Sequence, residues 1–335
     1  MRLQKTMISK EMLDVISGKI KNAKVSLVLS HQNPDGDTLG SMLALGEVLQ
    51  TLGHKVDRVI SDPVPEVYRF LPFSNLVKVP GDSSLGKKYD MAFSLDCGSV
   101  KRLGKAGILW SGSDTRVNID HHVSNERFGD INCIEADAAS TGQVVYWVAK
   151  GLNVRITPEV ATLLYTTLLT DTGCFSNSHT NAESLRWGAE LIDLGADHLR
   201  VYREVFMKKP YRAIKVFGSG LADLNLVCGG KIAWTYTSNE LLKKYSASAD
   251  DTEDIVDYVM RTEGVEVGIF FREDNSETKV SLRSNNDFDV SKIAAGYGGG
   301  GHKHAAGINI KSKFSDVRDL ILNNVIEEYK KTSGK

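Results

Sequence analysis

The sequence lacks a long hydrophobic run. No apolar stretch approaches the roughly 18 residues that a membrane span needs. The first twenty residues, MRLQKTMISKEMLDVISGKI, are charged throughout and contain no apolar core followed by small residues, so no secretion signal is expected. Together these absences predict a cytoplasmic protein that does not associate with membranes.

Cysteine is also scarce, with 4 residues in a chain of 335. The cysteines are scattered and form no CxxC pair. They are expected to be reduced core thiols, as is usual in a cytoplasmic protein. They are Cys97, Cys133, Cys174 and Cys228.

The sequence also has no excess of positive charge, because it contains 41 basic and 42 acidic residues and its net charge is −1. Proteins that follow long DNA or RNA usually carry a basic footprint. A local basic pocket is compatible with this average, but the balance favours a small substrate and argues against binding of long DNA.

Residues 25–190 alternate between strand and helix patterns. The strand candidates are VSLVLS, KVDRVIS, YDMAFSLD, TRVNID and INCIEAD, and helices are expected between the first strand and Gly53 and at about 140–150, 158–170 and 182–194. Strands separated by helices predict an α/β domain with a parallel sheet covered on both faces. Such sheets bind ligands beyond the carboxyl ends of their strands.

The pattern changes beyond a helical stretch at 197–207. MKKPYR reads as a linker, and KIAWTYTS, VEVGIFFRE and TKVSLRSN read as strands of mixed pattern, with helices at 252–262, 289–295 and 315–330. We therefore expect a first domain over residues 1–195, a linker helix and linker over 196–215, and a smaller α+β domain over 216–335.

Aspartate and histidine gather at the ends of the apolar elements of the first domain. Each of these residues could simply belong to a turn or a helix cap. That explanation, however, would have to hold independently in four separate segments. A parallel sheet would instead bring these side chains to one edge. The set comprises His31, Asp35 and Asp37 after the first strand, Asp96 after the third, Asp120, His121 and His122 after the fourth, and Asp171 in a long helix.

Carboxylates mixed with imidazoles suit Mn²⁺ or a similar divalent ion better than a metal that prefers thiolates. So many anionic groups would raise one another's pKa values unless two ions were present. Two ions side by side can clamp a phosphoryl group. The residues alone therefore predict a two-metal site.

Four segments then resemble a known family. HQNPDGDTLGS, SLDCGS, NIDHH and TDTGCF are similar, in this order, to the motifs of the DHH phosphoesterases. The resemblance implies one ion on His31, Asp35 and Asp96 and a second on Asp37, Asp96, His121 and Asp171, so that Asp96 bridges. It implies two Mn²⁺ ions, with Mg²⁺ or Co²⁺ as substitutes. The catalytic residues implied are His122 at the reacting phosphate and Asp120, which would orient the imidazoles.

A second signature is AAGYGGGGHKHAAG at residues 294–307. Gly296, Gly298 and Gly301 fit GxGxxG, but the run follows a helix pattern instead of a strand, so a dinucleotide site is not expected. A flexible turn is one interpretation. The favoured one is an anion cradle of backbone N–H groups. The cradle residues are Gly299, Gly300, Gly301 and His302.

This stretch also resembles the glycine-rich signature of the domain that accompanies DHH domains in nano-RNases, pAp phosphatases and dinucleotide phosphodiesterases. Arg283 in SLRSN matches the substrate-binding arginine of that domain, and its guanidinium suits phosphate. Arg272 is a looser candidate, because a solvated arginine at a strand end is equally expected. The resemblance implies an active site in the cleft between the two domains.

The function implied is hydrolysis of short nucleotides, namely RNA oligomers of about two to five nucleotides, pApA, and pAp to AMP. Cyclic di-AMP hydrolysis is a first alternative. Inorganic pyrophosphatase is a second, although the basic Arg-Lys-Lys signature of that family is missing. A non-catalytic nucleotide sensor is a third, and the complete acidic set argues against it. The oligomeric state is left open, with a homodimer as the one assembly considered.

Overall fold

The computed structural model describes residues 8–86 and 88–333. The chain divides into two compact units, Met1–Lys208 and Lys209–Lys335. This division falls inside the segment 196–215 that the sequence predicts as the linker. The first seven residues, on which the absence of a secretion signal partly depends, lie outside the described residues.

The first unit contains a six-stranded sheet in the order β3-β2-β1-β4-β5-β6, and all its strand pairs are parallel. The strand order reverses between β1 and β4, which is where open α/β sheets bind ligands. The prediction of an α/β domain with a parallel sheet is confirmed. The strands are β1 Val25–Ser30, β2 Lys55–Val59, β3 Val77–Lys78, β4 Met91–Leu95, β5 Thr115–Asp120 and β6 Ile131–Ile134.

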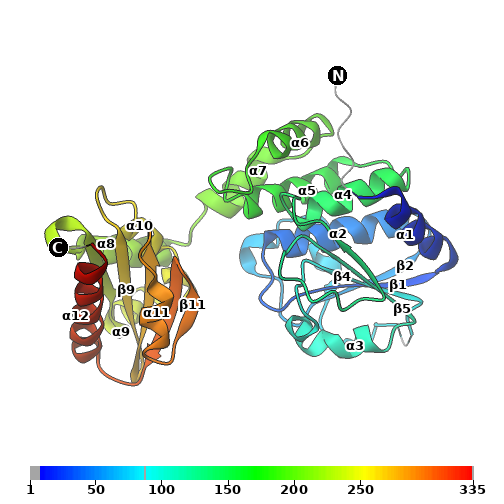
Figure 1. Cartoon of the computed structure of the whole chain (residues 1–335). Helices are drawn as coiled ribbons and strands as arrows, with labels where there is room; N and C mark the ends of the chain where they lie inside the picture. The colour runs from blue at the N-terminus through cyan, green and yellow to red at the C-terminus, as the bar shows by residue number, and fades with distance from the viewer. Residues whose placement is uncertain (1–7, 87, 334–335) are drawn as a thin grey trace. The chain divides into compact units, whose positions relative to one another are not determined.

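Helices cover both faces of this sheet. Figure 1 shows α2, α4 and α5 on one face and α3 on the other. In β1, Val28 packs into the core under α2, whereas Leu27 and Leu29 pack toward Trp110 of α3, so the strand is buried on both sides. The helices are α1 Lys10–Asn22, α2 Gly36–Thr51, α3 Gly107–Ser111, α4 Thr141–Gly151, α5 Pro158–Asp171, α6 Ala182–Asp193 and α7 His198–Tyr202, with short 3₁₀ turns at Glu66–Tyr68, Ser74–Leu76 and Val100–Ala106 and a π-helical turn at Arg203–Met207.

The second unit has its own six-stranded sheet in the order β11-β12-β10-β9-β8-β7. Only the β8–β9 pair is parallel among the pairs of this sheet, which confirms an α+β domain of smaller size. Phe271 packs on one face with Ile321, and Phe270 packs on the other with Ile255. The strands are β7 Asn225–Val227, β8 Ile232–Thr237, β9 Val267–Asp274, β10 Glu277–Ser284, β11 Gly300–His302 and β12 Ala305–Ile310; the helices are α8 Tyr211–Ala222, α9 Asn239–Tyr245, α10 Ile255–Val259, α11 Val290–Ala295 and α12 Phe314–Ser333, with 3₁₀ turns at Cys228–Gly230 and Asp250–Thr252.

Two local expectations are wrong. Arg272 is not solvated: it is 7% exposed and donates to the Ala249 carbonyl and the Thr252 hydroxyl, both at 3.1 Å, because the chain after α9 folds over its strand. The prediction of core thiols holds for two of the four cysteines, whereas Cys174 and Cys228 are half-buried. All four are free thiols.

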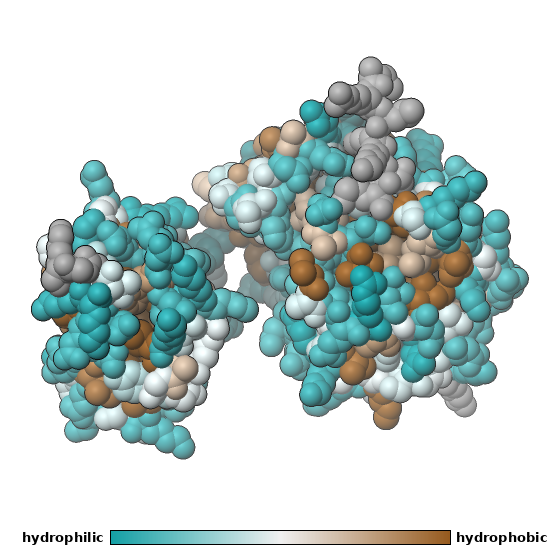
Figure 2. All heavy atoms as spheres, viewed as in Figure 1, coloured by the Kyte–Doolittle hydropathy of each residue, from teal (hydrophilic) through white to brown (hydrophobic). Residues whose placement is uncertain are grey.

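The surface is mostly polar on the side shown in Figure 2, where apolar residues form separate patches. Among the described residues, no helix combines the length and the hydropathy that crossing a bilayer requires.

Candidate metal centre

The predicted ligands meet at the carboxyl ends of β1, β4 and β5. His31 directly follows β1 and Asp96 directly follows β4, the neighbouring strands at which the sheet order reverses. The His31 Nε2 atom lies 3.4 Å from Asp96 Oδ2. Together with Asp35, these two side chains form a group whose potential ligand atoms lie within 4.8 Å of one another.

A second group surrounds His121, which follows β5. Its Nε2 atom lies 3.8 Å from Asp37 Oδ2, 3.9 Å from Asp96 Oδ1 and 3.5 Å from Asp171 Oδ2. Asp96 thus turns Oδ2 toward the first group and Oδ1 toward the second. This is the arrangement that a bridging carboxylate requires.

Both imidazoles of these groups are oriented by backbone carbonyls. The Nδ1 atom of His31 lies 2.7 Å from the Gln32 carbonyl oxygen, and Nδ1 of His121 lies 3.2 Å from that of Ala138. A carbonyl can only accept, so Nδ1 carries the proton in each ring. The Nε2 atoms therefore face the carboxylates as potential metal ligands, held in the way that metal-binding histidines usually are.

Helix ends place two of the carboxylates. Asp35 is the N-cap residue of α2 and accepts from the backbone N–H of Thr38 at 2.9 Å. Asp37 accepts from the N–H groups of Thr141 and Gly142, at 2.8 and 3.1 Å, in the first turn of α4. The positive end of that helix dipole favours the ionised carboxylate. The capping role that composition alone suggests for Asp35 is present, and its second oxygen is left over for another partner.

Two threonines that the sequence analysis missed also contact Asp96. The hydroxyl of Thr38 donates to Asp96 Oδ2 at 3.0 Å and lies 2.6 Å from His31 Nε2. The hydroxyl of Thr141 donates to Asp96 Oδ1 at 3.1 Å. Each threonine lies in the first turn of a helix that carries or contacts an aspartate ligand, and that position is the signal that could have identified them. Asp96 itself has a left-handed backbone, with φ 53°.

Asp120 is fully buried and acts on the loop that follows β5. It accepts from the N–H groups of His121 and His122 at 2.7 and 3.3 Å, and from the Asn125 amide at 2.5 Å. It also lies 2.8 Å from Nδ1 of His122, and this hydrogen bond raises the pKa of His122 to about 9. Asp120 therefore orients one of the two rings, because Ala138 holds that of His121.

The electrostatics of this cluster suit a cation. Burial, followed by the charges of Asp96 and Asp171, raises the pKa of Asp37 well above its usual range. Burial also raises the pKa of Asp171. Burial opposes ionisation of Asp96 as well, but the His31 hydrogen bond and the charges of His122, His31 and His121 together outweigh it and lower the pKa. A divalent ion would favour the charged form of every carboxylate here, so the residues fit the metal that the motifs imply.

His179 is a further residue that the sequence analysis missed. Its Nδ1 atom lies 2.9 Å from Asp171 Oδ2, and with His121 and Asp171 it forms a third group of potential ligands. No motif spacing marks His179, since it follows α5 in a loop. Only the path of that loop brings it to the centre.

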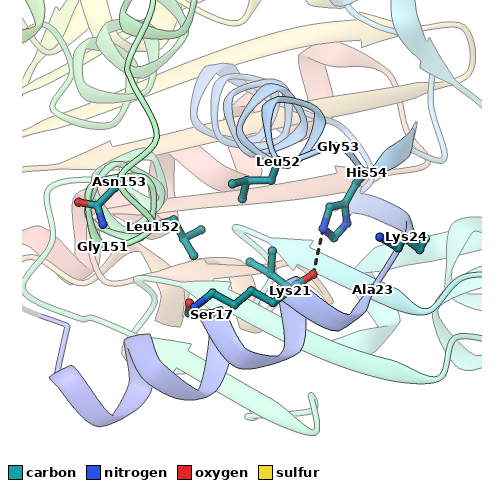
Figure 3. A pocket seen from close by; sticks show the side chains of 11 residues that line it. Ser17, Lys21, Ala23, Lys24, Leu52, Gly53, His54, Gly151, Leu152 and Asn153 are labelled. Atoms are coloured by element: carbon teal, nitrogen blue, oxygen red, sulfur yellow. Dashed lines mark hydrogen bonds between the residues drawn. The ribbon is translucent and has the colours of Figure 1, made fainter.

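A cavity of about 230 Å³ opens beside the carboxylates. Part of its wall is apolar or aromatic, from the 3₁₀ turn that ends at Tyr68 and from the π-helical turn 203–207. It is lined by Asp35, Asp37, Tyr68, Thr170, Asp171, Val205 and Phe206. A larger cavity of about 360 Å³ lies at the amino ends of the strands (Figure 3) and includes His54 but none of the predicted site residues.

In the second unit, the last part of the glycine stretch forms the edge strand β11, after a turn at residues 296–298. The register pairs Arg283 of β10 with Ala305 of β12, and Ala305 with His302 of β11, so Arg283 and His302 share one face about 10 Å apart. Side chains at Gly299 and Gly301 would collide with the backbone of β12, whereas one at Gly300 would meet open space. The turn interpretation therefore holds for residues 296–298 but not for Gly300 and Gly301, which pair with β12. The pairing with β12 explains Gly299 and Gly301 but not Gly300.

Arg283 also has a partner within its own unit. Its Nε donates to Oδ1 of Asp257 at 2.9 Å, and its side chain is 32% exposed. The carboxylate of Asp257 is 52% exposed, so the ion pair lies at the surface of the sheet. A phosphate could take the place of that carboxylate, because both accept from the same guanidinium fork.

Comparison with known proteins identifies the class. Residues 26–168 match the DHH family, N-terminal domain, and residues 231–331 match the DHHA1 domain. The chain belongs to the DHH family of phosphoesterases, as the four motifs predict. It is similar, at 32% identity over 331 residues that cover 97% of the chain and 94% of the relative, to a protein of Thermus thermophilus named bifunctional oligoribonuclease and PAP phosphatase NrnA.

Two further similarities agree with this. A Bacillus subtilis protein of the same name is 25% identical over 296 residues, covering 87% of this chain and 90% of its own. Among solved structures, an exopolyphosphatase-related protein from Bacteroides fragilis superimposes with a TM-score of 0.87 at 24% identity, covering 98% of this chain and 99% of the other. This likeness supports the fold of both units.

Proposed function

We propose that this protein hydrolyses short nucleotides with two divalent ions: RNA oligomers of about two to five nucleotides, pApA, and pAp to AMP. The observation that carries the proposal is the placement of Asp96, whose two oxygens face two separate groups of ligands. The names of the Thermus and Bacillus relatives supply the substrate class. We expect the protein to act in the cytoplasm.

His31, Asp35 and Asp96 would hold the first ion; Asp37, Asp96, His121 and Asp171 would hold the second. Mn²⁺ is the ion that this donor set favours, with Mg²⁺ or Co²⁺ as substitutes. Two such ions polarise a phosphoryl group and lower the pKa of water. The protein's own contribution is a rigid frame, since the helix ends, threonine hydroxyls and backbone carbonyls described above fix the ligands before substrate arrives.

His122 is the group proposed to contact the reacting phosphate. Asp120 accepts its Nδ1 proton and raises its pKa to about 9, which favours the cationic form of the ring. Its Nε2–H can then donate to a phosphate oxygen, and the positive charge favours the negative charge that develops there. Asp120 acts by fixing the ring and its protonation state.

The cavity beside the carboxylates can take the base or sugar next to the scissile phosphate, because Tyr68 and Phe206 offer aromatic surface. In the second unit, Arg283 and His302 would bind another phosphate or base of the same substrate. The open edge of β11, with Gly300 and Gly301, would contribute its backbone groups, whereas the Gly299 N–H already bonds to the Ala294 carbonyl at 2.9 Å. Few basic residues are required for so short a ligand, which agrees with the net charge of −1.

One comparison tests the proposal. The purified protein is given Mn²⁺ and either pAp, pApA, a five-nucleotide RNA, cyclic di-AMP or pyrophosphate, and turnover of each is measured by chromatography. We expect the first three to be hydrolysed and EDTA to abolish the reaction. Pyrophosphate or cyclic di-AMP as the best substrate, or full turnover after chelation, would overturn the proposal.

A further inference from the structure

His179 is joined to the second ligand group by a single strong contact. Its Nδ1–H donates to Asp171 Oδ2 at 2.9 Å, and the same oxygen lies 3.5 Å from His121 Nε2. The rings of His179 and His121 meet edge to face, with centroids 5.6 Å apart. Asp171 therefore lies between two imidazoles, and His179 is the one that the metal ligands of the proposed site do not include.

The loop that brings His179 next to Asp171 has an unfavourable backbone conformation. After α5 ends at Asp171, Gly173, Cys174 and Phe175 all have positive φ values, 56°, 57° and 64°. A left-handed backbone costs about 1–2 kcal/mol at a residue other than glycine. Cys174 and Phe175 therefore carry this cost, and strain of this kind is typical of functional sites.

Hydrogen bonds also connect this loop to Asp171. The Asn177 amide donates to the backbone carbonyl of Asp171 at 2.9 Å, and Asn177 Oδ1 accepts from the N–H of His179 at 3.0 Å. Backbone N–H groups of Ser176 and Asn177 both bond to the Thr172 carbonyl. The position of His179 is thus specified by several bonds and is not an accident of a loose loop.

The position of Asp171 explains why a hydrogen-bond donor is useful to it. It is the last residue of α5, where the helix dipole disfavours a negative charge. Its side chain is still 25% exposed, so it has room to rotate toward solvent. A fixed donor on Oδ2 favours one orientation of the carboxylate, as partners of metal ligands commonly do.

We propose that His179 is a positioning residue for the second divalent ion: its hydrogen bond to Asp171 holds that carboxylate beside His121. The inference rests on the proposed function in that it takes Asp171 to bind an ion. It predicts that loss of the donor weakens the second ion selectively. The first ion, held by His31, Asp35 and Asp96, should be unaffected.

The test uses the full-length protein, freed of metal and titrated with Mn²⁺, with free Mn²⁺ measured by its EPR signal. We compare wild type with His179→Ala, His179→Asn and the control His198→Ala, which removes a half-buried imidazole that packs against Tyr165. The asparagine amide nitrogen can occupy the position of the histidine Nδ1 atom, so His179→Asn retains a donor. Circular dichroism checks that each variant is folded.

We expect wild type, His198→Ala and His179→Asn to bind two ions with similar affinities. His179→Ala should bind the second ion about 10- to 100-fold more weakly. Its hydrolytic activity should be low at limiting Mn²⁺ and recover at high Mn²⁺. If His179→Ala matches wild type, or if His179→Asn is as weak as His179→Ala, the inference is wrong while the proposed function stands. A wild type that binds fewer than two ions would overturn both.

Discussion

Asp96→Asn should remove the activity and leave the fold intact. Asparagine has the same shape as aspartate and tolerates a left-handed backbone, so the φ of 53° is retained. Its carbonyl oxygen can still accept from one of the two threonine hydroxyls, at Thr38 or Thr141. We therefore expect the melting temperature to change by only a few degrees.

The loss of activity can be estimated from the geometry. Asp96 Oδ1 lies 3.9 Å from the Nε2 atom of His121, one of the proposed ligands of the second ion. If the ion that His121 binds lies within a similar distance of Asp96, removal of one unit of carboxylate charge about 4 Å from one unit of positive charge costs about 4 kcal/mol at an effective dielectric constant of about 20. At about 1.4 kcal/mol per factor of ten, this is about a thousandfold in rate, and loss of contact with both ions makes it a lower bound.

The assay is kcat and KM for pAp and a trinucleotide RNA at saturating Mn²⁺. Asp35→Asn, which alters a ligand of only one ion, should be no more damaging than Asp96→Asn. Asp130→Asn is the matched control, since Asp130 pairs with Arg116 at the surface, at the opposite ends of the strands. Near-wild-type turnover by Asp96→Asn under these conditions would refute the bridging role.

Three other predictions follow from the structure. Arg283→Ala should raise KM for short nucleotides by about 10- to 100-fold, which corresponds to the loss of a hydrogen bond to a charged group. The increase in KM should be smaller for a small phosphodiester that cannot reach Arg283. An equal increase for the two kinds of substrate would contradict the role of Arg283. Phe206→Ala should raise KM about 5- to 150-fold if a base stacks on the ring, and an unchanged KM would exclude that contact. Burial lowers the pKa of His54 in the folded chain, so protonation favours the unfolded chain, and the free energy of unfolding should fall as the pH drops below about 6.5. In urea unfolding measured from about pH 8 to about pH 5, His54→Gln should show a smaller fall than wild type. An equal fall in both proteins would mean that another group causes the effect.

Much of the first unit could be predicted from the sequence because its signals are local. The strands β1, β4 and β5 are buried over most of their length, and each ends at a polar residue or directly before one. The parallel arrangement then brings His31, Asp96 and His121 to one edge. Their proximity could be predicted because chain order and strand ends alone determine their neighbourhood, whereas their assignment as ligands came from the resemblance to the DHH motifs.

What could not be predicted depends on contacts between distant segments. Thr141 contacts Asp96 across 45 residues, and His179 reaches Asp171 only through the left-handed turn at 173–175. Neither arrangement leaves a periodic pattern. Helix α8 was not predicted from the sequence, because Gly218 and Gly220 resemble linker residues. In the structure, Gly220 lies in this helix next to Ile255.

The short strands of the second unit were missed for a related reason. β11 is only three residues long and two of them are glycine, so the sequence suggested an anion cradle or a flexible turn and not a strand. Its pairing with β12 depends on the close backbone approach at Gly299 and Gly301, which appears only once both segments are placed.

The length of the preferred substrate tests the central claim most directly. The measurement is kcat/KM with Mn²⁺ for RNA from two to about thirty nucleotides, at one salt concentration and with equal concentrations of chain ends. A protein with net charge −1 and few phosphate contacts should give values that peak at about two to five nucleotides and fall for longer chains. Rapid, undiminished digestion of RNA tens of nucleotides long would contradict the account.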